Sequence, residues 1–313
     1  MRVLVVAEFS PLGEAVIEGL LAGHHEIVEI WYGSGRSGGD IEPTKRQARS
    51  FAKHLKHLDK GRGLPFRDIG GTSHEERLSL LDAIGRPSGL VSAGSAIIFR
   101  QPFLDAFDVA VNFHPTLLPH YRGPHPLDAL ILHGDADRYG GMTMHLINAG
   151  IDEGAIVAQR AIPRSSARHD LDWRRRLSRA AGQMIEVDFA HLISGEIEPS
   201  TQALEAGSYV RLEDHQFTIN EAWTAQQVER VMMDSGVMGQ KRLVRPLRST
   251  RGYFVCGRPK LLGRPSGADM VVRPWSVELD VEDGRLVLGR ERRPQRWRRK
   301  FLMMWDRLRF GSG

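Results

Sequence analysis

Two polar side chains follow an apolar run in the stretch VAVNFHPTLLPHYRG (109–123). Asn112 and His114 are two residues apart, so on a β-strand both point to the same face of the sheet. Pro115 comes directly after His114, Pro119 follows four residues later, and both restrict the backbone, so we expect the chain to leave the strand there. In open α/β sheets ligands bind at the carboxyl ends of strands. The spacing therefore predicts an amide and an imidazole at a binding edge.

A carboxylate is expected beside this pair. The alternating stretch GGMTMHLINAG (140–150) predicts a strand that leads into the tight turn GIDEG (150–154), which would present Asp152 or Glu153 at a neighbouring strand end. An amide and an imidazolium can stabilise a developing oxyanion, and a carboxylate can organise proton removal from a nucleophile. The set suits acyl transfer. From spacing alone, a turn-capping Asn/His pair and an ordinary turn aspartate remain open alternatives.

Other chemistries find less support. A Ser-His-Asp hydrolase needs a G-x-S-x-G nucleophile elbow, which the sequence lacks. The Gly-rich stretch GSGRSGG (33–39) follows the second predicted strand, whereas a dinucleotide fingerprint follows the first; it is either a surface loop or a contact for an acceptor. The chain has one cysteine, Cys256, and the pair His54 and His57 lacks further ligands. We therefore expect no metal.

The elements that must position these residues alternate between strand and helix. VLVVA (3–7) is a buried strand, residues 10–25 form a helix with Ser10 as N-cap and Pro11 at its first position, and residues 26–33 return as a strand. This β-α-β opening predicts a Rossmann-like parallel sheet covered by helices. Further strands are expected at 89–98, 108–114, 140–150 and 155–163, and further helices at 44–61, 74–85, 126–135 and 170–195.

The composition changes after about residue 200, so the 313 residues are expected to form two domains, 1–200 and 208–313. Short strand patterns such as WSVELDV and GRLVLG predict that the second is small and mostly β, ending in a basic helix. The net charge is +5, and basic residues gather at 44–63 and 290–300. They could bind an anionic partner such as tRNA. No run reaches the ~20 apolar residues of a membrane span, and we expect a cytoplasmic protein; the oligomeric state stays open.

The central stretch resembles the signature of the 10-formyltetrahydrofolate-dependent formyltransferases. The likeness comprises Asn-Phe-His-Pro-Thr-Leu-Leu-Pro (112–119), Tyr-Arg-Gly (121–123), Gly-Asp (134–135), Gly-Met-Thr (141–143) and Gly-Ile-Asp-Glu-Gly-Ala-Ile-Val-Ala-Gln (150–159). The motifs keep their register over nearly fifty residues, and the β-α-β opening is similar too. The resemblance covers roughly residues 1–200 and implies the formyltransferase-type α/β fold, with 10-formyltetrahydrofolate as co-substrate.

The same resemblance implies residue roles. Asn112, His114 and Asp152 would be the catalytic trio, in which Asp152 holds His114 in its charged form. The folate would lie against the backbone near the end of the 89–98 strand and in the 150–154 turn, and the acceptor against the Tyr-Arg-Gly element. The implied folate-binding residues are Ser95, Ala96, Ile97, Ile98, Gly150, Ile151 and Glu153, and the implied acceptor-binding residues are Thr116, Tyr121, Arg122 and Gly123.

The acceptor is the part that the resemblance leaves open. Where the methionyl-tRNA enzymes carry Ala-Ala-Pro-Ile after Arg-Gly, this chain has Pro-His-Pro-Leu (124–127). That departure favours a small acceptor, an amino sugar nucleotide or an amino-acid-derived amine such as hydroxyornithine. The alternatives are initiator methionyl-tRNA, which the basic segments could hold, and a catalytically silent folate- or RNA-binding module.

Overall fold

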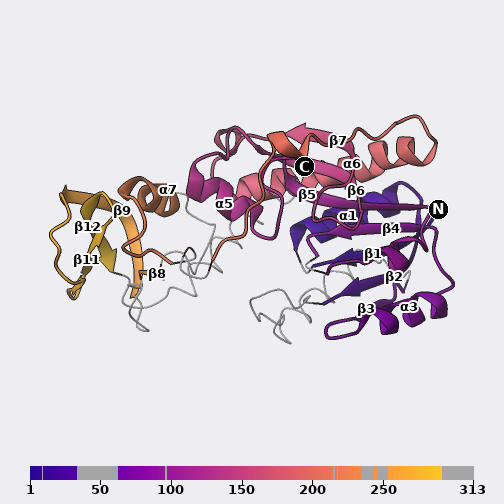
Figure 1. Ribbon diagram of the computed structural model, residues 1–313, viewed down its shortest axis with the longest axis horizontal. Helices are drawn as coiled ribbons and strands as arrows, with labels where there is room; N and C mark the ends of the chain where they lie inside the picture. Colours follow the sequence, from indigo (N-terminus) through magenta and orange to yellow (C-terminus); the bar gives the residue numbers. More distant parts are fainter. Residues whose placement is uncertain are drawn as a thin grey trace. The chain divides into compact units, whose positions relative to one another are not determined.

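The computed structural model describes residues 1–8, 10–33, 63–95, 97–213, 216, 218–233, 243–244 and 253–290 (Figure 1). The chain divides into two compact units, Met1–Arg211 and Leu212–Gly313. The helix expected at 44–61 and the basic segment after Arg290 lie outside the described residues, so the predicted anionic-partner surfaces are untested.

The first unit is built on a seven-stranded sheet in the order β3-β2-β1-β4-β5-β6-β7. The strands β3, β2, β1, β4 and β5 run parallel, as the β-α-β opening predicts. β6 is antiparallel to both β5 and β7, so the predicted parallel sheet is mixed at this edge. The strands are β1 Arg2–Ala7, β2 Glu26–Tyr32, β3 Phe66–Asp68, β4 Gly89–Ala93, β5 Val109–Thr116, β6 Gly140–Leu146 and β7 Ile156–Ala161.

The connection between β5 and β6 contains one short helix. α5 spans Pro126–His133, eight residues, and so is about 12 Å long. β5 has eight residues and is about 26 Å long, so α5 spans less than half of the length of β5. The chain re-enters the sheet beside the end of β5, where Gly140 pairs with Thr116.

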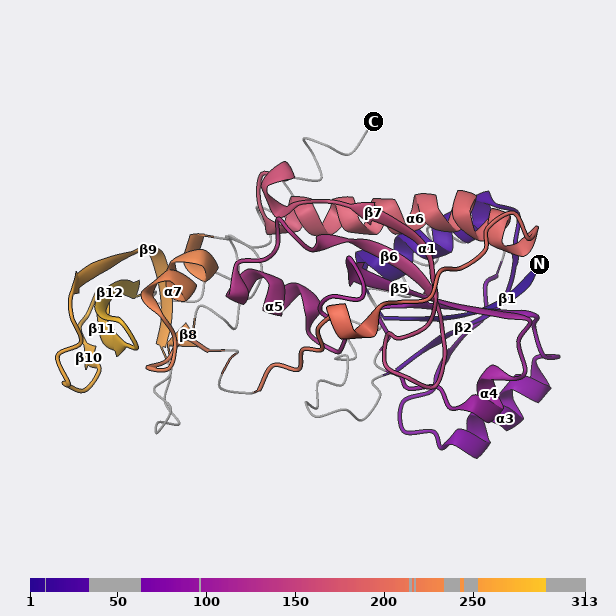
Figure 2. The same cartoon turned by 45° about the horizontal axis from the view of Figure 1, so that its top comes forward.

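Helices cover both faces of this sheet. α1 (Pro11–Ala22) and α6 (Asp170–Ile193) lie side by side on one face, and α3 (His74–Ala83) and α4 (Gln101–Leu104) lie on the other (Figure 2). Ser10 caps α1 by accepting from the Gly13 N–H, as predicted. α1 and α6 approach closely at Gly19, where an added Cβ would lie 2.5 Å from the Gly182 carbonyl oxygen. Two short 3-10 turns, Arg164–Ser166 and Leu204–Ala206, complete the unit.

β5 runs past the point where the sequence analysis ends it. The strand continues through Pro115 to Thr116, and its register against β6 shifts between His114 and Thr116. Proline can occupy a strand at such an irregularity, because no ladder hydrogen bond is required of its nitrogen there. The prediction that Pro115 turns the chain out of the strand is therefore wrong by two residues.

The second unit is a five-stranded antiparallel sheet with one described helix, α7 (Ala225–Met233). Its strand order is β10-β11-β12-β9-β8, and alternate residues of β11 and β12 are buried, including Val277, Leu279, Leu286 and Leu288. This confirms the prediction of a small, mostly β unit. Its strands are β8 Leu243–Val244, β9 Tyr253–Gly263, β10 Val271–Val272, β11 Ser276–Val281 and β12 Gly284–Arg290. In the described part of the chain, no helix combines the length and apolarity that crossing a bilayer requires.

Candidate active site

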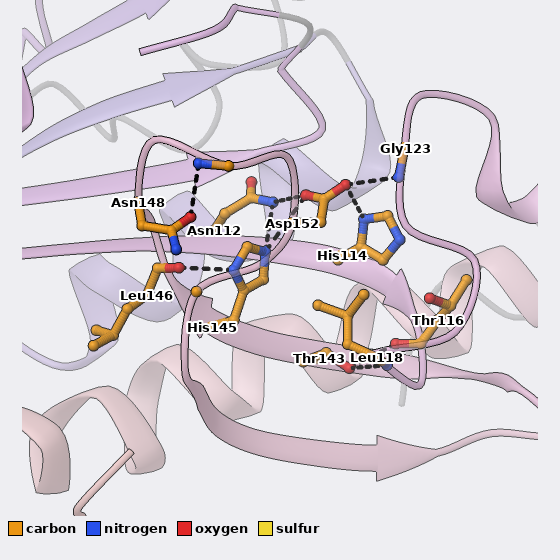
Figure 3. Close-up of polar contacts among 12 residues, drawn as sticks. Asn112, His114, Thr116, Leu118, Gly123, Thr143, His145, Leu146, Asn148 and Asp152 are labelled. Atoms are coloured by element: carbon orange, nitrogen blue, oxygen red, sulfur yellow. Dashed lines mark hydrogen bonds and ion pairs between the residues drawn. The ribbon is translucent and has the colours of Figure 1, made fainter. Parts of the chain in front are cut away.

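Asn112 and His114 project from one face of β5, the fifth strand of the sheet, as their spacing predicts (Figure 3). His114 is buried, and Asn112 is half-buried. Their cross-strand partners on β6 are His145 and Thr143, so two histidines and an amide share one patch of the sheet.

Asp152 completes the patch from the loop between β6 and β7. Its Oδ2 lies 3.4 Å from His114 Nδ1 and accepts the Gly123 N–H at 2.9 Å, and its Oδ1 accepts from Asn112 Nδ2 at 3.4 Å (Figure 3). Because β6 is antiparallel, this loop leaves the sheet near the start of β5 and folds over the strand. The carboxylate therefore reaches the pair from the loop, and not from a parallel strand end as the sequence analysis expected.

Two loop residues at this site have left-handed backbones. Asp152 has φ +55° and Tyr121 has φ +59°, and they are two of four non-glycine residues with positive φ in the described chain. Aspartate tolerates this region, but a bulky tyrosine adopts it at an energetic cost. Such strain persists where the surroundings hold it, and it gathers at functional sites.

The ring of His114 faces an acceptor at each nitrogen. Nε2 lies 2.9 Å from the Tyr121 carbonyl oxygen, so Nε2 carries a proton and donates it there. Burial lowers the pKa of His114 and outweighs the Asp152 carboxylate and the Tyr121 carbonyl, which both raise it. Asp152 thus raises the pKa of His114, as expected, but burial of the ring outweighs this effect and favours the neutral form. Nδ1 is then a lone pair facing a carboxylate.

Asp152 is an anion in this arrangement. Burial opposes its ionisation, but attraction to His114 and His145 when these rings are protonated, and the hydrogen bond from the Gly123 N–H, lower its pKa below the ordinary range. The 3.4 Å gap between Oδ2 and His114 Nδ1 exceeds the 2.7–3.2 Å of a good N–H···O hydrogen bond. The pair is therefore able to take up one proton between two acceptor atoms.

His145 is a member of this site that the sequence analysis missed. Its Nδ1 lies 2.8 Å from the Leu146 carbonyl oxygen and so donates to it, which leaves Nε2 to accept from Asn112 Nδ2 at 3.1 Å. His145 Nε2 also lies 3.6 Å from Asp152 Oδ1. The available signal was the alternation of β6, which places Thr143 and His145 on one face two residues apart.

The Tyr-Arg-Gly element that follows β5 lies beside the trio. The Tyr121 hydroxyl donates to Asp135 Oδ2 and lies 3.3 Å from His133 Nδ1, and burial raises the pKa of Tyr121. Arg122 Nη1 donates to Glu153 Oε1 at 2.8 Å, while its buried Nε has no hydrogen-bond partner among the described residues.

Two of the predicted acceptor-binding residues make hydrogen bonds within the protein. Thr116 is fully buried, and its hydroxyl donates to the His120 carbonyl at 2.8 Å, so it braces the turn after β5. The Gly123 N–H is engaged by Asp152. The prediction that Thr116 touches an acceptor is wrong in this structure, because its side chain has no exposed surface.

The predicted folate-binding segments flank the trio. Residues 95–98 follow β4, whose Ala93 pairs with Phe113 between the two catalytic candidates on β5. Ile98 and Ile151 are 61% and 44% exposed, an unusual state for large apolar side chains that suits a flat heterocycle. Ile97 is buried, Ser95 Oγ accepts from the Ile97 N–H, and the Gly150 N–H donates to Asn148. Ala96 lies outside the described residues. In the described chain, no three His, Cys, Asp or Glu side chains are arranged to hold a metal ion.

Comparison with known proteins gives the family. The model of the formyl transferase family matches residues 3–185, more than half of the chain and the whole of this site. The chain belongs to the formyl transferase family. Among relatives, the methionyl-tRNA formyltransferase of Roseiflexus sp. is 36% identical over 121 residues, and that of Albidiferax ferrireducens is 26% identical over 230 residues. The alignments cover 39% and 71% of this chain, and 37% and 68% of those relatives.

Solved structures show the same formyl transferase fold. A sugar N-formyltransferase from Shewanella sp. superposes with a TM-score of 0.60 at 18% identity, covering 84% of this chain and 99% of that one. An N-formyltransferase from Helicobacter canadensis, in complex with folinic acid and dTDP-3-aminofucose, superposes with a TM-score of 0.55 at 15% identity, covering 93% of this chain and 99% of that one. At these identities the likeness is one of fold.

Proposed function

We propose that this protein transfers a formyl group from 10-formyltetrahydrofolate to the amine of a small acceptor. The observation that carries the proposal is the convergence of Asn112, His114 and Asp152, each within 3.4 Å of another member of the trio. An amide donor, an imidazole and a carboxylate around one point are what attack on a formyl carbon requires. Membership of the formyl transferase family supports the same chemistry.

The co-substrate fits the residues that flank the trio. The exposed Ile98 and Ile151 offer apolar surface to a pterin ring, and backbone groups beside them can hydrogen-bond its edge. The relative from Helicobacter canadensis was solved with folinic acid, which is consistent with a folate here. When bound, 10-formyltetrahydrofolate supplies an activated formyl carbon.

Asn112 stabilises the charge that develops on the formyl oxygen. Of its two Nδ2 hydrogen bonds, the one to His145 is 3.1 Å long and the one to Asp152 is 3.4 Å long. The longer bond is the weaker one, so this N–H can turn to the oxyanion while His145 keeps the amide in place.

His114 and Asp152 take the proton that the attacking amine loses. The resting ring is neutral, with its proton on Nε2, and Nδ1 faces the carboxylate. A proton arriving between Nδ1 and Oδ2 converts the ring to imidazolium, which Asp152 then stabilises. The positive ring in turn favours the oxyanion beside it. When the tetrahedral intermediate collapses, the imidazolium returns this proton to the leaving folate nitrogen, so the products are an N-formyl compound and tetrahydrofolate.

A small acceptor is favoured by the charge around Arg122. This side chain already pairs with Glu153 at 2.8 Å, so its charge is compensated and less suited to a tRNA phosphate. An amino sugar nucleotide or an amino-acid-derived amine such as hydroxyornithine would be such an acceptor.

Initiator methionyl-tRNA is the second candidate acceptor. The observation in its favour is the family of relatives: the two sequences compared above are both methionyl-tRNA formyltransferases. The basic segments 44–63 and 290–300 would supply the phosphate contacts in that case.

Parallel incubations distinguish these acceptors. The protein is mixed with 10-formyltetrahydrofolate and, separately, with amino-deoxy sugar nucleotides, N-hydroxyornithine and charged initiator tRNA, and the N-formyl product is identified by mass spectrometry. Formylation of a small amine supports the proposal. Formylation of the charged tRNA alone would replace the acceptor, and folate binding with no product from any amine would show a silent binding module.

A further inference from the structure

A segment beyond the matched family region holds both loops of the candidate site. Residues 202–210, here called the strap, follow α6 and lie after residue 185, where the family match ends. The strap belongs to the first unit. None of its residues belongs to the catalytic trio, and its hydrogen bonds go to the loops on either side of the trio.

Gln202 fixes the loop that presents Asp152. Its side chain is buried, and its Nε2 donates to the Asp152 carbonyl at 2.9 Å and to the Gly154 carbonyl at 2.6 Å. One amide group thus satisfies two backbone carbonyls of a turn that contains a residue at φ +55°. Without these donors the two carbonyls would be left unsatisfied in a buried place, so the turn would relax.

Ser208 fixes the loop that presents the Tyr121 carbonyl to His114. Its Oγ accepts from the Tyr121 N–H at 2.9 Å, and its backbone N–H and C=O bond to Pro119 and Arg122. Tyr121 is therefore held on its nitrogen by Ser208 and on its ring by Asp135, and it accepts from His114 Nε2 through its oxygen. The strap leaves no space at Gly207, where an added Cβ would lie 2.3 Å from the Pro119 oxygen.

We infer that Gln202 and Ser208 are positioning residues for the formyl transfer, each fixing one of the two groups that flank the imidazole of His114. The effect on kcat rests on the proposed function, whereas the effect on the position of the two loops rests only on the contacts described above. Misplacing a reacting group by about 1 Å lowers a rate by roughly 10²-fold, so small movements of these loops are sufficient to lower kcat.

The test compares matched substitutions in the full chain. Gln202→Met keeps the length of the side chain but removes both N–H donors, and Ser208→Ala removes the hydroxyl. Ser208→Thr restores an acceptor at the same place. Ser194→Ala and Gln183→Ala, at exposed positions near the end of α6 and on its surface, serve as controls.

We expect Gln202→Met and Ser208→Ala to lower kcat roughly 10- to 100-fold with less than about a twofold change in the KM for folate. Ser208→Thr and both controls should keep the wild-type kcat. A uniform loss of stability with kcat unchanged in the two variants would overturn the inference.

A second readout does not depend on any substrate. The pKa of His114, followed by NMR of its ring nitrogens, should fall in both variants, because each loosens a group that raises it. If the wild type formylates nothing, the proposed function fails while this comparison still tests the strap. An unchanged His114 pKa in folded Gln202→Met and Ser208→Ala would refute the positioning role.

Discussion

His145 lies directly opposite Asn112 in the β5–β6 ladder, and its Nε2 accepts from Asn112 Nδ2 at 3.1 Å. The Leu146 carbonyl fixes the proton of the neutral His145 ring on Nδ1, which leaves Nε2 as a hydrogen-bond acceptor. The amide of Asn112 therefore has a defined orientation before any substrate enters. A histidine that the sequence analysis passed over sets the direction of the proposed oxyanion donor.

Replacing His145 should lower kcat and leave the KM for folate nearly unchanged. In His145→Ala, Asn112 loses its fixed partner and its amide can rotate, so we expect kcat to fall by about 10²-fold, comparable to weakening one oxyanion donor. The KM for folate should change little. Steady-state kinetics measure both, and His191→Ala, at an exposed histidine on α6, serves as the control. A change confined to KM would contradict the orienting role.

The pH dependence should show an acid limb that belongs to His114. Burial lowers the pKa of His114 from its ordinary value of 6.5, so the ring stays neutral at neutral pH and gains its second proton only below pH 6.5. A protonated Nδ1 cannot take the proton from the amine, so kcat should fall as the pH falls through that pKa. Profiles with two acceptor amines of different pKa identify the limb, because the enzyme's limb does not move. A limb that follows the amine would count against His114 as proton acceptor.

Gly154 should tolerate no side chain. An added Cβ would lie 1.7 Å from the Leu146 carbonyl oxygen, the group that fixes the His145 proton. We expect Gly154→Ala to destabilise the fold by about 1–3 kcal/mol and to lower activity as well. Gly195→Ala is the control: its φ of +77° costs about 1–2 kcal/mol of strain, but no atom lies within 4 Å. Urea unfolding and initial rates measured side by side should separate the two, with activity lost at 154 alone.

The exposed isoleucine after β4 should report on the folate. Ile98→Ser removes apolar surface that is 61% exposed, so the melting temperature should hardly change. The KM for 10-formyltetrahydrofolate should rise roughly tenfold, since burying an isoleucine against a ligand contributes about 1.5 kcal/mol or more. Val187→Ser, at a residue that is 48% exposed on α6, should leave the KM unchanged. Equal KM values in the two variants would remove Ile98 from the folate pocket.

The sequence predicted most of the first unit because its signals are local. The buried run of β1, the Ser10–Pro11 start of α1 and the spacing of Asn112 and His114 each depend on a few neighbouring residues. The direction of β6 is a different kind of information. An alternating strand pattern has no direction, so the antiparallel pairing of β6 with β5 is visible only in the structure.

The same limit explains what was missed in the site. His145 faces Asn112 only through the antiparallel register, so its role could not be inferred without the direction of β6. The neutral state of His114 depends on its burial, which spacing does not reveal. Gln202 and Ser208 act on loops that are more than forty residues away along the chain.

The most direct test of the account follows an isotopically labelled formyl group in a single turnover. Labelled 10-formyltetrahydrofolate and the preferred small amine are mixed with excess wild-type enzyme, Asp152→Asn, or Asp82→Asn, which removes an exposed carboxylate of α3. We expect the label on the amine nitrogen with the wild type and Asp82→Asn, and a rate lower by about 10²- to 10⁴-fold with Asp152→Asn. Transfer by Asp152→Asn at the wild-type rate would contradict the catalytic trio.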